Sequence, residues 1–237
     1  MKNHSIDTQR LAVVTPVGRE SETIESFIIA VRSNLAKEDS HILVTDKYTD
    51  IETKKIIESK CITEYPQVIW LDLPFSNGIA SVYIAGYSYA LKMNFTHFIE
   101  MDAGFSHDPT LLRLFKSESV NYDVVFGNRF SSHSVYQTTL KRKIISKGGS
   151  FLSRLVLGVK IKDMTSGYQL FSRKAITKIL NHGIQSKGPF FQTEMKYLTT
   201  KFELSYHEIP ISYSNPSHHI TWKEIFNSLL ALKRIAK

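Results

Sequence analysis

The chain has 237 residues, of which 42% are hydrophobic, and its formal net charge at pH 7 is +8. This length can bury a full core as one large or two small domains, and no apolar run approaches the ~20 residues that span a bilayer. The first ten residues are polar, without a signal-peptide core, and a single cysteine, Cys61, excludes an intrachain disulfide and a cysteine-based metal site. We therefore expect a cytoplasmic protein in a reducing environment.

Short apolar runs alternate with helical patterns along the first half of the chain. The runs at 11–15, 41–45, 68–71, 97–101 and 123–126 suit buried parallel strands. Helical periodicity lies between them, near 20–36, 50–60, 77–92 and 109–118. The alternation predicts an α/β fold with a doubly wound, mostly parallel central sheet flanked by helices. Since no internal repeat, low-complexity stretch or Gly/Ser linker interrupts the chain, we expect a single domain over residues 1–237.

An acidic residue, Asp102, follows the fourth apolar run. Asp108-Pro109 then marks the start of the next helix, with Asp as N-cap and Pro at the first helical position. Open α/β sheets bind ligands beyond the carboxyl ends of their strands. Asp102 is therefore a candidate ligand-binding residue, although capping and turn formation use the same residue type more often.

The segment Met101-Asp-Ala-Gly-Phe-Ser-His-Asp-Pro109 resembles the Asp-x-Asp segment of family 2 glycosyltransferases, especially the dolichyl- and polyprenyl-phosphate mannose synthase branch. The resemblance covers roughly residues 9–213, with its motifs in the family's order. It implies a Rossmann-like GT-A fold, the nucleotide-diphospho-sugar transferase fold, in which two acids hold a divalent cation against the pyrophosphate of a nucleotide sugar. Gly104 replaces the second acid here, so the implied ligands of Mg²⁺ or Mn²⁺ are Asp102 and, weakly, Ser106. One carboxylate can suffice when water and substrate phosphates complete the shell.

The first two strand ends and the start of the third helix also match the family. Pro16, Glu20 and Asp46 retain parts of the Pro-x-x-Asn/Asp-Glu and Asp-Asp-Gly-Ser patterns that line the nucleotide. Lys47-Tyr48 replaces the Gly-Ser pair, so the resemblance implies a nucleotide site but not the identity of the base. Gly78 opens a helix with the family's spacing of small residues. Close packing is the main interpretation of this helix, whose small residues are Gly78, Ala85 and Gly86, and close approach of its backbone to a ligand is the alternative.

Positive charge gathers between Asp123 and Asp163. This segment contains no acidic residue and eight basic ones: Arg129, Lys141, Arg142, Lys143, Lys147, Arg154, Lys160 and Lys162. Such a segment suits a solvated basic face, a nucleic-acid patch or a phosphate-binding acceptor site at a membrane surface. We expect no nucleic-acid partner, because no nucleic-acid-binding module and no interleaved aromatics accompany the charge.

The same segment extends the resemblance. The run from Lys141 to Arg154 closely resembles the Lys-Arg-x-x-x-Ser-x-Gly segment of polyprenyl-phosphate sugar synthases. By that resemblance Arg129 and Arg142 are catalytic-site arginines that bind the lipid phosphate. Lys143 and Lys147 are expected at the periphery, in contact with anionic headgroups.

Two further motifs follow. The segment 163–173 looks like the family's Asp-x-Thr-Ser-Gly-Phe-Arg-x-Phe motif, which implies that Thr165, Ser166 and Gly167 lie beside the sugar or acceptor with hydroxyls and exposed backbone N–H groups. Gln169 stands where the family usually has Arg.

The second of these motifs is Pro189–Met195, which resembles the family's Phe-Gln-x-Glu-Met helix. It implies a sugar- or acceptor-binding role for Gln192 and a catalytic role for Glu194, which could orient sugar hydroxyls or accept a proton from an alcohol. The alternative for Glu194 is an acid placed near a helix N-terminus.

The C-terminal part departs from the family and ends in a helical pattern. The segment 212–221 lacks the expected Arg-x-x-Gly-x-Ser-Lys loop, and His218 and His219 stand there either as surface residues or as substitutes for its phosphate contacts. Residues at about 221–237 form an amphipathic helical pattern with basic residues near its end. Packing on the domain or on a partner subunit is the default interpretation, and an interfacial membrane helix is the alternative.

Together these features predict an inverting glycosyltransferase that moves a sugar from a nucleotide-sugar donor to a polyprenyl, dolichyl-type, phosphate. The alternatives are a glycosyltransferase with a saccharide acceptor in polysaccharide synthesis and a degenerate noncatalytic nucleotide-binding module. The enzyme is expected in the cytoplasm, either free or at the inner face of a membrane.

Overall fold

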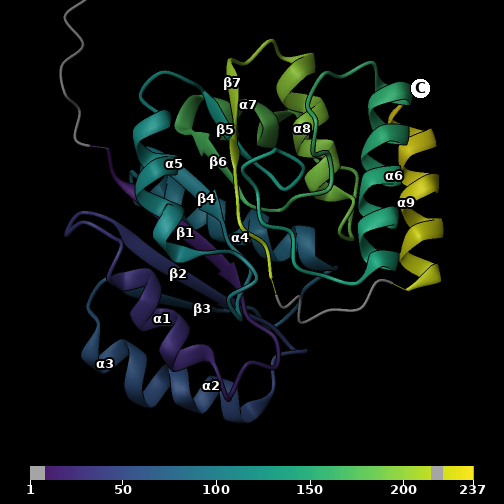
Figure 1. Ribbon diagram of the computed structural model, residues 1–237. Helices are drawn as coiled ribbons and strands as arrows, with labels where there is room; N and C mark the ends of the chain where they lie inside the picture. Colours follow the sequence, from purple (N-terminus) through teal and green to yellow (C-terminus); the bar gives the residue numbers. More distant parts are fainter. Residues whose placement is uncertain (1–8, 215–220, 237) are drawn as a thin grey trace, which may run out of the picture.

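A seven-stranded sheet runs through the middle of the computed structural model (Figure 1), which describes residues 9–214 and 221–236 apart from the side chains of residues 60–62. The strands are β1 (Leu11–Pro16), β2 (Ser40–Thr45), β3 (Val68–Asp72), β4 (His97–Glu100), β5 (Val124–Asn128), β6 (Gln169–Ser172) and β7 (Tyr206–Pro210). Their order in the sheet is β3-β2-β1-β4-β6-β5-β7. The five strands expected from the sequence are therefore confirmed, and two more are present: β6 lies between β4 and β5, and β7 forms an edge.

Helices follow most strands. They are α1 (Ile24–Arg32), α2 (Ile51–Ile56), α3 (Ile62–Glu64), α4 (Ile79–Lys92), α5 (Leu112–Glu118), α6 (Leu140–Leu157), α7 (Arg173–His182), α8 (Phe191–Lys201) and α9 (Trp222–Ile235). A π-helical turn, Ile57–Cys61, joins α2 to α3, and a 3₁₀ turn, Pro109–Leu111, precedes α5. Asp108 caps that turn by accepting a hydrogen bond from the Thr110 N–H, as the Asp-Pro signal predicts.

Six of the strands run in one direction. Parallel pairing joins β3, β2, β1 and β4, and it also joins β5 to β7. The inserted strand β6 is antiparallel to both β4 and β5, so β5 points the same way as β4. The carboxyl ends of six strands and the amino end of β6 therefore share one edge of the sheet. Ligands of open α/β sheets bind at such an edge.

Two hydrophobic layers enclose the sheet. On one face α4, α7 and α8 pack against alternate strand residues such as Val14, Phe98 and Phe126. On the other face α1 and α5 pack against the neighbouring residues of the same strands, including Val13 and Ile99. The alternation is that of strands buried on both faces, which explains why their sequences read as continuous apolar runs.

Helix α4 lies unusually close to the sheet. A Cβ atom on Gly86 would come within 2.4 Å of the Val14 side chain. The small residue therefore serves close packing of α4 on β1, which was the main interpretation of this helix from its sequence.

Helices α6 and α9 lie side by side on one flank of the molecule (Figure 1). Ala231 and Leu232 of α9 are buried, in a small cluster with Phe190. Packing of the C-terminal helix on the domain is thus confirmed. Within the described ranges, no helix combines the length and apolar character needed to cross a membrane.

Candidate active site

The shared edge of the sheet brings together residues from distant parts of the chain. Asp102 follows β4, Arg129 follows β5, and the segment 163–168 leads into β6. Because β4, β6 and β5 are adjacent in the sheet, these three segments meet at the same edge. The topology therefore places the predicted metal-binding acid beside the predicted phosphate-binding residues.

The Asp102 carboxylate is hydrogen-bonded by one neighbour and flanked by another. Tyr83 of α4 donates its hydroxyl hydrogen to Oδ1 over 3.1 Å, and His107 Nε2 lies 3.8 Å from Oδ2. The Asp102 side chain is 43% exposed, whereas the His107 side chain is buried. Asp102 therefore presents an oriented carboxylate to solvent, as a residue that binds a cation or substrate must.

The protonation of His107 follows from its surroundings. The backbone N–H of Asp102 donates to His107 Nδ1 over 3.1 Å, so Nδ1 is unprotonated and Nε2 carries the hydrogen. Burial lowers the pKa of His107, which keeps the ring neutral near pH 7. Nε2 has no hydrogen-bond partner among the described residues, and at 3.8 Å from Asp102 Oδ2 it faces that carboxylate without a hydrogen bond to it. The stacked ring of Tyr168, 4.8 Å between centroids, fixes the imidazole.

The donor set for a metal ion is sparse. In the described part of the chain no group of three or more His, Cys, Asp or Glu side chains could hold an ion. Gly104 has a φ of +85° and offers no side-chain oxygen, and Ser106 is buried at 3% exposure. Asp102 remains as one accessible anionic donor. This set fits a hard cation that takes most of its ligands from water and a diphosphate, and it does not fit a cation held by protein alone.

Pro16 and Glu20 lie next to this acid. Pro16 is the last residue of β1, and Glu20 Oε2 accepts a hydrogen bond from the Gly18 N–H at 2.5 Å. Burial raises the pKa of Glu20, and the nearby negative charges of Asp50 and Asp102 raise it further. Glu20 is therefore electrostatically coupled to the predicted metal-binding acid.

Asp46 lies almost buried at the end of β2. Its Oδ1 accepts from the Tyr48 N–H at 2.8 Å, and its Oδ2 accepts from the hydroxyl of Ser76, a residue that follows β3. The first bond closes the turn after β2, and the second joins the ends of β2 and β3. They agree with the alternative of a turn residue, and contact with a nucleoside stays a prediction.

Gly78 has a structural requirement of its own. Its φ is +85°, and an added Cβ would meet the Lys187 carbonyl oxygen at 2.4 Å. That same carbonyl accepts a hydrogen bond from the Ala80 N–H at the start of α4. Packing against the segment at 187 thus explains the glycine, and a nucleotide contact remains a prediction.

Arg129 is held in a buried ion pair. Its Nε donates to Asp163 Oδ2 and its Nη2 to Asp163 Oδ1, each over 2.8 Å, and Nη2 also donates to Thr165 Oγ1 over 2.7 Å. Burial disfavours the charged guanidinium, but Asp163 outweighs burial and raises the pKa of Arg129. Nη1 forms no hydrogen bond with any residue of the described ranges. Arg129 is therefore a permanently charged and rigidly oriented group.

Arg142 joins Arg129 at one aromatic ring. Arg142, in the first turn of α6, donates from Nη2 to the Tyr213 hydroxyl over 3.0 Å. The guanidinium carbons of Arg129 and Arg142 lie 5.3 and 5.8 Å from the centre of the Tyr213 ring. The ring of Tyr213 also lies 5.7 Å from that of His107, which adjoins Asp102. The two predicted phosphate-binding arginines thus meet beside the predicted metal-binding acid.

The Thr-Ser-Gly segment is mostly covered. Thr165 is half-buried and accepts from Arg129, but Ser166 and Gly167 are buried, so the expectation of exposed backbone groups is wrong for these two residues. The cause is α8, because a Cβ on Gly167 would lie 2.0 Å from Gln192 Nε2. Gln192 is half-exposed and covers Gly167. Thr165 and Gln192 are therefore the members of this predicted group that can reach a ligand.

Glu194 is placed away from a catalytic role. It is 2% exposed, its Oε1 accepts from the Gln185 N–H at 2.7 Å, and its Oε2 accepts from the Ser186 N–H at 2.8 Å. Both carboxylate oxygens are thus committed to holding the segment before α8. This placement argues against the predicted role of Glu194 as a catalytic acid or base.

A buried polar network lies beneath the site. Glu100 accepts from the Tyr87 hydroxyl and, at 2.9 Å, from Gln169 Nε2. Burial raises the pKa of Glu100 to about 8 and lowers that of the neighbouring Lys196 to about 8. Lys196 donates to the Ser166 carbonyl. Gln169, which replaces the family's arginine, thus binds a core carboxyl group, and Lys196 supplies a buried cation nearby.

Sequence reasoning assigned no role to His107, Tyr213 or Lys196. His107 and Tyr213 lie within segments that the sequence comparison singled out, so their positions near the site could have been predicted. Lys196 is a buried cation within a helix, and no sequence pattern marks it. His218 and His219 lie outside the described residues.

Comparison with protein families and curated relatives identifies what the chain resembles. The family model described as "Glycosyl transferase family 2" matches residues 12–180. The polyprenol monophosphomannose synthase of Mycolicibacterium smegmatis is 29% identical over 209 residues, which cover 87% of this chain and 78% of that protein. The undecaprenyl-phosphate mannosyltransferase of Micrococcus luteus is 28% identical over 205 residues, 86% of this chain and 83% of that protein.

Solved structures support the fold. Glucosyl-3-phosphoglycerate synthase from Mycobacterium tuberculosis in complex with uridine diphosphate aligns with a TM-score of 0.72 at 13% identity, over 98% of this chain and 81% of that one. The same enzyme with Mn²⁺, UDP-glucose and phosphoglyceric acid aligns with a TM-score of 0.71 at 14% identity and the same coverage. The GT-A fold expected from the sequence is thereby confirmed.

Proposed function

This chain belongs to glycosyl transferase family 2, and from that premise we propose that it transfers a sugar, with inversion, from a nucleoside-diphosphate sugar to a polyprenyl phosphate. The observation that carries the choice of acceptor is the convergence of Arg129 and Arg142 on Tyr213, beside His107 and Asp102. Two curated relatives, named for polyprenol and undecaprenyl-phosphate substrates, support the same acceptor class.

The donor is assigned to the side of the site formed by β1, β2 and β4. Pro16, Glu20 and Asp46 would line the nucleoside, and the Asp102 carboxylate would face the diphosphate. A bound Mg²⁺ or Mn²⁺ would neutralise the negative charge that develops on the leaving diphosphate. The Tyr83 hydroxyl holds the Asp102 carboxylate for this purpose, with His107 packed beside it, so little reorganisation is needed when the donor binds.

The acceptor phosphate is assigned to the arginine pair. Asp163 fixes the plane of the Arg129 guanidinium, and Tyr213 fixes that of Arg142. Two oriented guanidinium groups suit the oxygens of a phosphomonoester, and they would aim one oxygen at the anomeric carbon of the donor. Thr165 and Gln192 would contact the sugar or the acceptor.

The burial of Glu194 favours a phosphate acceptor over a saccharide. A sugar hydroxyl must lose a proton during attack, and the acid expected to accept that proton is engaged by two backbone N–H groups. A phosphate acceptor is already ionised and needs no such base. One observation favours the alternative of a noncatalytic nucleotide-binding module: Gly104 stands where the family has the second acid of the metal site.

Arg142→Ala tests the acceptor assignment. A charge-assisted phosphate contact contributes about 1.5–3 kcal/mol, so the variant should lose one to two orders of magnitude in transfer to polyprenyl phosphate while donor binding is retained. Lys160→Ala, in the same basic segment but outside the site, is the matched control and should behave as wild type. Equal transfer by both variants would remove Arg142 from the acceptor site, and transfer to a saccharide alone would replace the acceptor class.

A further inference from the structure

Helix α6 has its amphipathic pattern reversed. Its buried residues are serines, namely Ser146, Ser150 and Ser153. Its large apolar residues point away from the domain: Leu140, Ile144, Phe151 and Leu155 are each more than 60% exposed. Their spacing of four, seven and four residues places them on one stripe of the helix. A helix that packs only on its own domain would carry these side chains inward.

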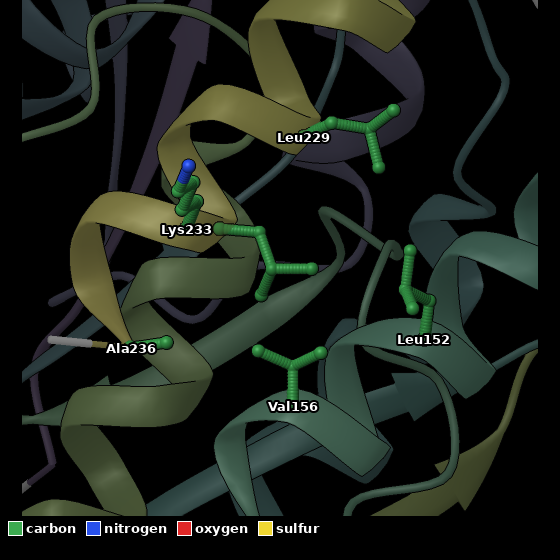
Figure 2. Close-up of a pocket in the computed structure, with 6 residues that line it drawn as sticks. Leu152, Val156, Leu229, Lys233 and Ala236 are labelled. Atoms are coloured by element: carbon green, nitrogen blue, oxygen red, sulfur yellow. The ribbon is translucent and has the colours of Figure 1, made fainter.

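Helix α9 also carries exposed apolar residues. Trp222, Phe226, Leu229 and Leu230 are all exposed, although Ala231 and Leu232 of the same helix are buried. Between the two helices lies an apolar groove of about 340 Å³ lined by Leu152, Val156, Leu229, Leu232, Lys233 and Ala236. Figure 2 shows Leu152 and Val156 on α6 facing Leu229 on α9 across this groove. We call the exposed apolar residues of α6 and α9, with the groove, the α6–α9 face.

Positive charge borders the α6–α9 face. Helix α6 contains five basic residues and no acidic one, and α9 contains three basic residues and one acidic residue. Lys143, Lys147 and Arg154 recur at spacings of four and seven, so they form a basic stripe alongside the apolar stripe of α6. Apolar side chains beside lysine and arginine match the interface of a bilayer that contains anionic lipids. Two copies of the face apposed to each other would bring the basic stripes together, which disfavours a dimer.

The face begins at the proposed acceptor site. Lys141 Nζ lies 5.6 Å from the centre of the Trp222 ring, so the first turns of α6 and α9 adjoin. The next residue, Arg142, donates to Tyr213 within the site. An acceptor whose phosphate lies at Arg142 would therefore have its chain close to the α6–α9 face.

We propose that the α6–α9 face docks the protein on the surface of an anionic bilayer, with the apolar side chains inserted at the interface and the basic stripe on the lipid headgroups. The inference rests on the proposed function and adds that the enzyme would bind its lipid acceptor directly from the bilayer. Docking itself requires neither donor nor acceptor.

Vesicle binding of the full chain tests the proposal. The probes are phosphatidylcholine vesicles with and without phosphatidylglycerol, free of polyprenyl phosphate, with co-sedimentation and tryptophan fluorescence, to which Trp70 and Trp222 contribute, as readouts. Wild type should bind the anionic vesicles more tightly, with a blue shift of emission. Phe151→Ser/Leu155→Ser should weaken binding at least tenfold, and Ile51→Ser/Val120→Ser, exposed apolar residues elsewhere, should not. Lys143→Gln/Lys147→Gln should weaken binding to anionic vesicles roughly fivefold per lysine, with Lys55→Gln as control.

Other outcomes separate the alternatives. Absence of wild-type binding, or equal binding by the Phe151→Ser/Leu155→Ser variant, would overturn the proposal. A wild-type dimer that this variant dissociates would instead assign the face to a second copy. Transfer to a short-chain, water-soluble prenyl phosphate should persist in the variant. Transfer without docking would refute the membrane docking and leave the proposed function intact. Docking without transfer to any lipid phosphate would support the membrane docking and refute the proposed function.

Discussion

Replacing Asp163 with Asn should lower the free energy of unfolding by about 3–5 kcal/mol, because it leaves the buried Arg129 guanidinium without its counter-charge. Three bonds converge on this carboxylate from Arg129 alone: Nε and Nη2 at 2.8 Å and the backbone N–H at 3.0 Å. Both side chains are almost fully buried, at 4% and 0% exposure. The Asp163 charge also supports the buried Lys196 ammonium. Two buried cations would therefore lose compensation at once.

Urea unfolding of the wild type and variant measures this loss. Burial alone would raise the pKa of Asp163, but Arg129 outweighs burial and lowers it. The contribution of the carboxylate is therefore present above its unfolded pKa of about 3.8 and is lost as the pH falls through the lower folded value. Asp123→Asn, which removes a carboxylate paired with the largely exposed Lys174, is the control and should cost about 1 kcal/mol or less. A loss for Asp163→Asn no larger than that of the control would refute the reasoning.

Three further substitutions probe the site and the network beneath it. Asp102→Asn should abolish divalent-dependent binding of a nucleoside diphosphate in calorimetric titration with little loss of stability, since the side chain is 43% exposed; unchanged affinity with and without metal would remove it from the site. Gly104→Asp should strengthen the metal dependence, because an added Cβ meets no atom within 4 Å, at a cost of about 1 kcal/mol in stability for an Asp at positive φ; no change would mean that the loop has been rebuilt. The folded pKa of Glu100 lies above the unfolded one, so the wild type should lose up to about 1.4 kcal/mol of stability per pH unit as the pH rises from about 4.5 to about 8. Glu100→Gln should not show this loss. Parallel pH profiles of the two proteins would show that Glu100 does not titrate in this window.

The strands that could be predicted from the sequence are those with continuous apolar runs. Residues 41–45 and 98–101 are buried on both faces, so their hydrophobicity directly reports their position in the sheet. Strand β7 lies at an edge and contains Tyr206, His207 and Glu208, so its pattern is not that of a buried strand. Helix α6 was read only as a basic segment, because its inward face is serine and its apolar face is exposed.

The site divides in the same way. Local motifs identified Asp102, Arg129 and Arg142, and the shared sheet edge brings them together. The role of Glu194 depends on two backbone N–H groups of another segment, and that of Ser166 depends on the Lys196 side chain and the cover of α8; no local pattern reports such contacts. The partner of Arg129 was likewise not predictable as such: Asp163 was visible as a motif residue, but its ion pair with Arg129 requires β5 and β6 to be neighbours.

Direct measurement of sugar transfer tests the central claim. The full chain is incubated with a panel of nucleoside-diphosphate sugars, Mg²⁺ or Mn²⁺, and polyprenyl phosphate, and the lipid product is identified by mass spectrometry. The account predicts one polyprenyl-phosphate sugar, formed with inversion at the anomeric carbon, at a rate lower by one to two orders of magnitude in Arg142→Ala and unchanged in Lys160→Ala. Donor binding without transfer to any lipid phosphate or saccharide would contradict it and would identify the chain as a noncatalytic nucleotide-binding module.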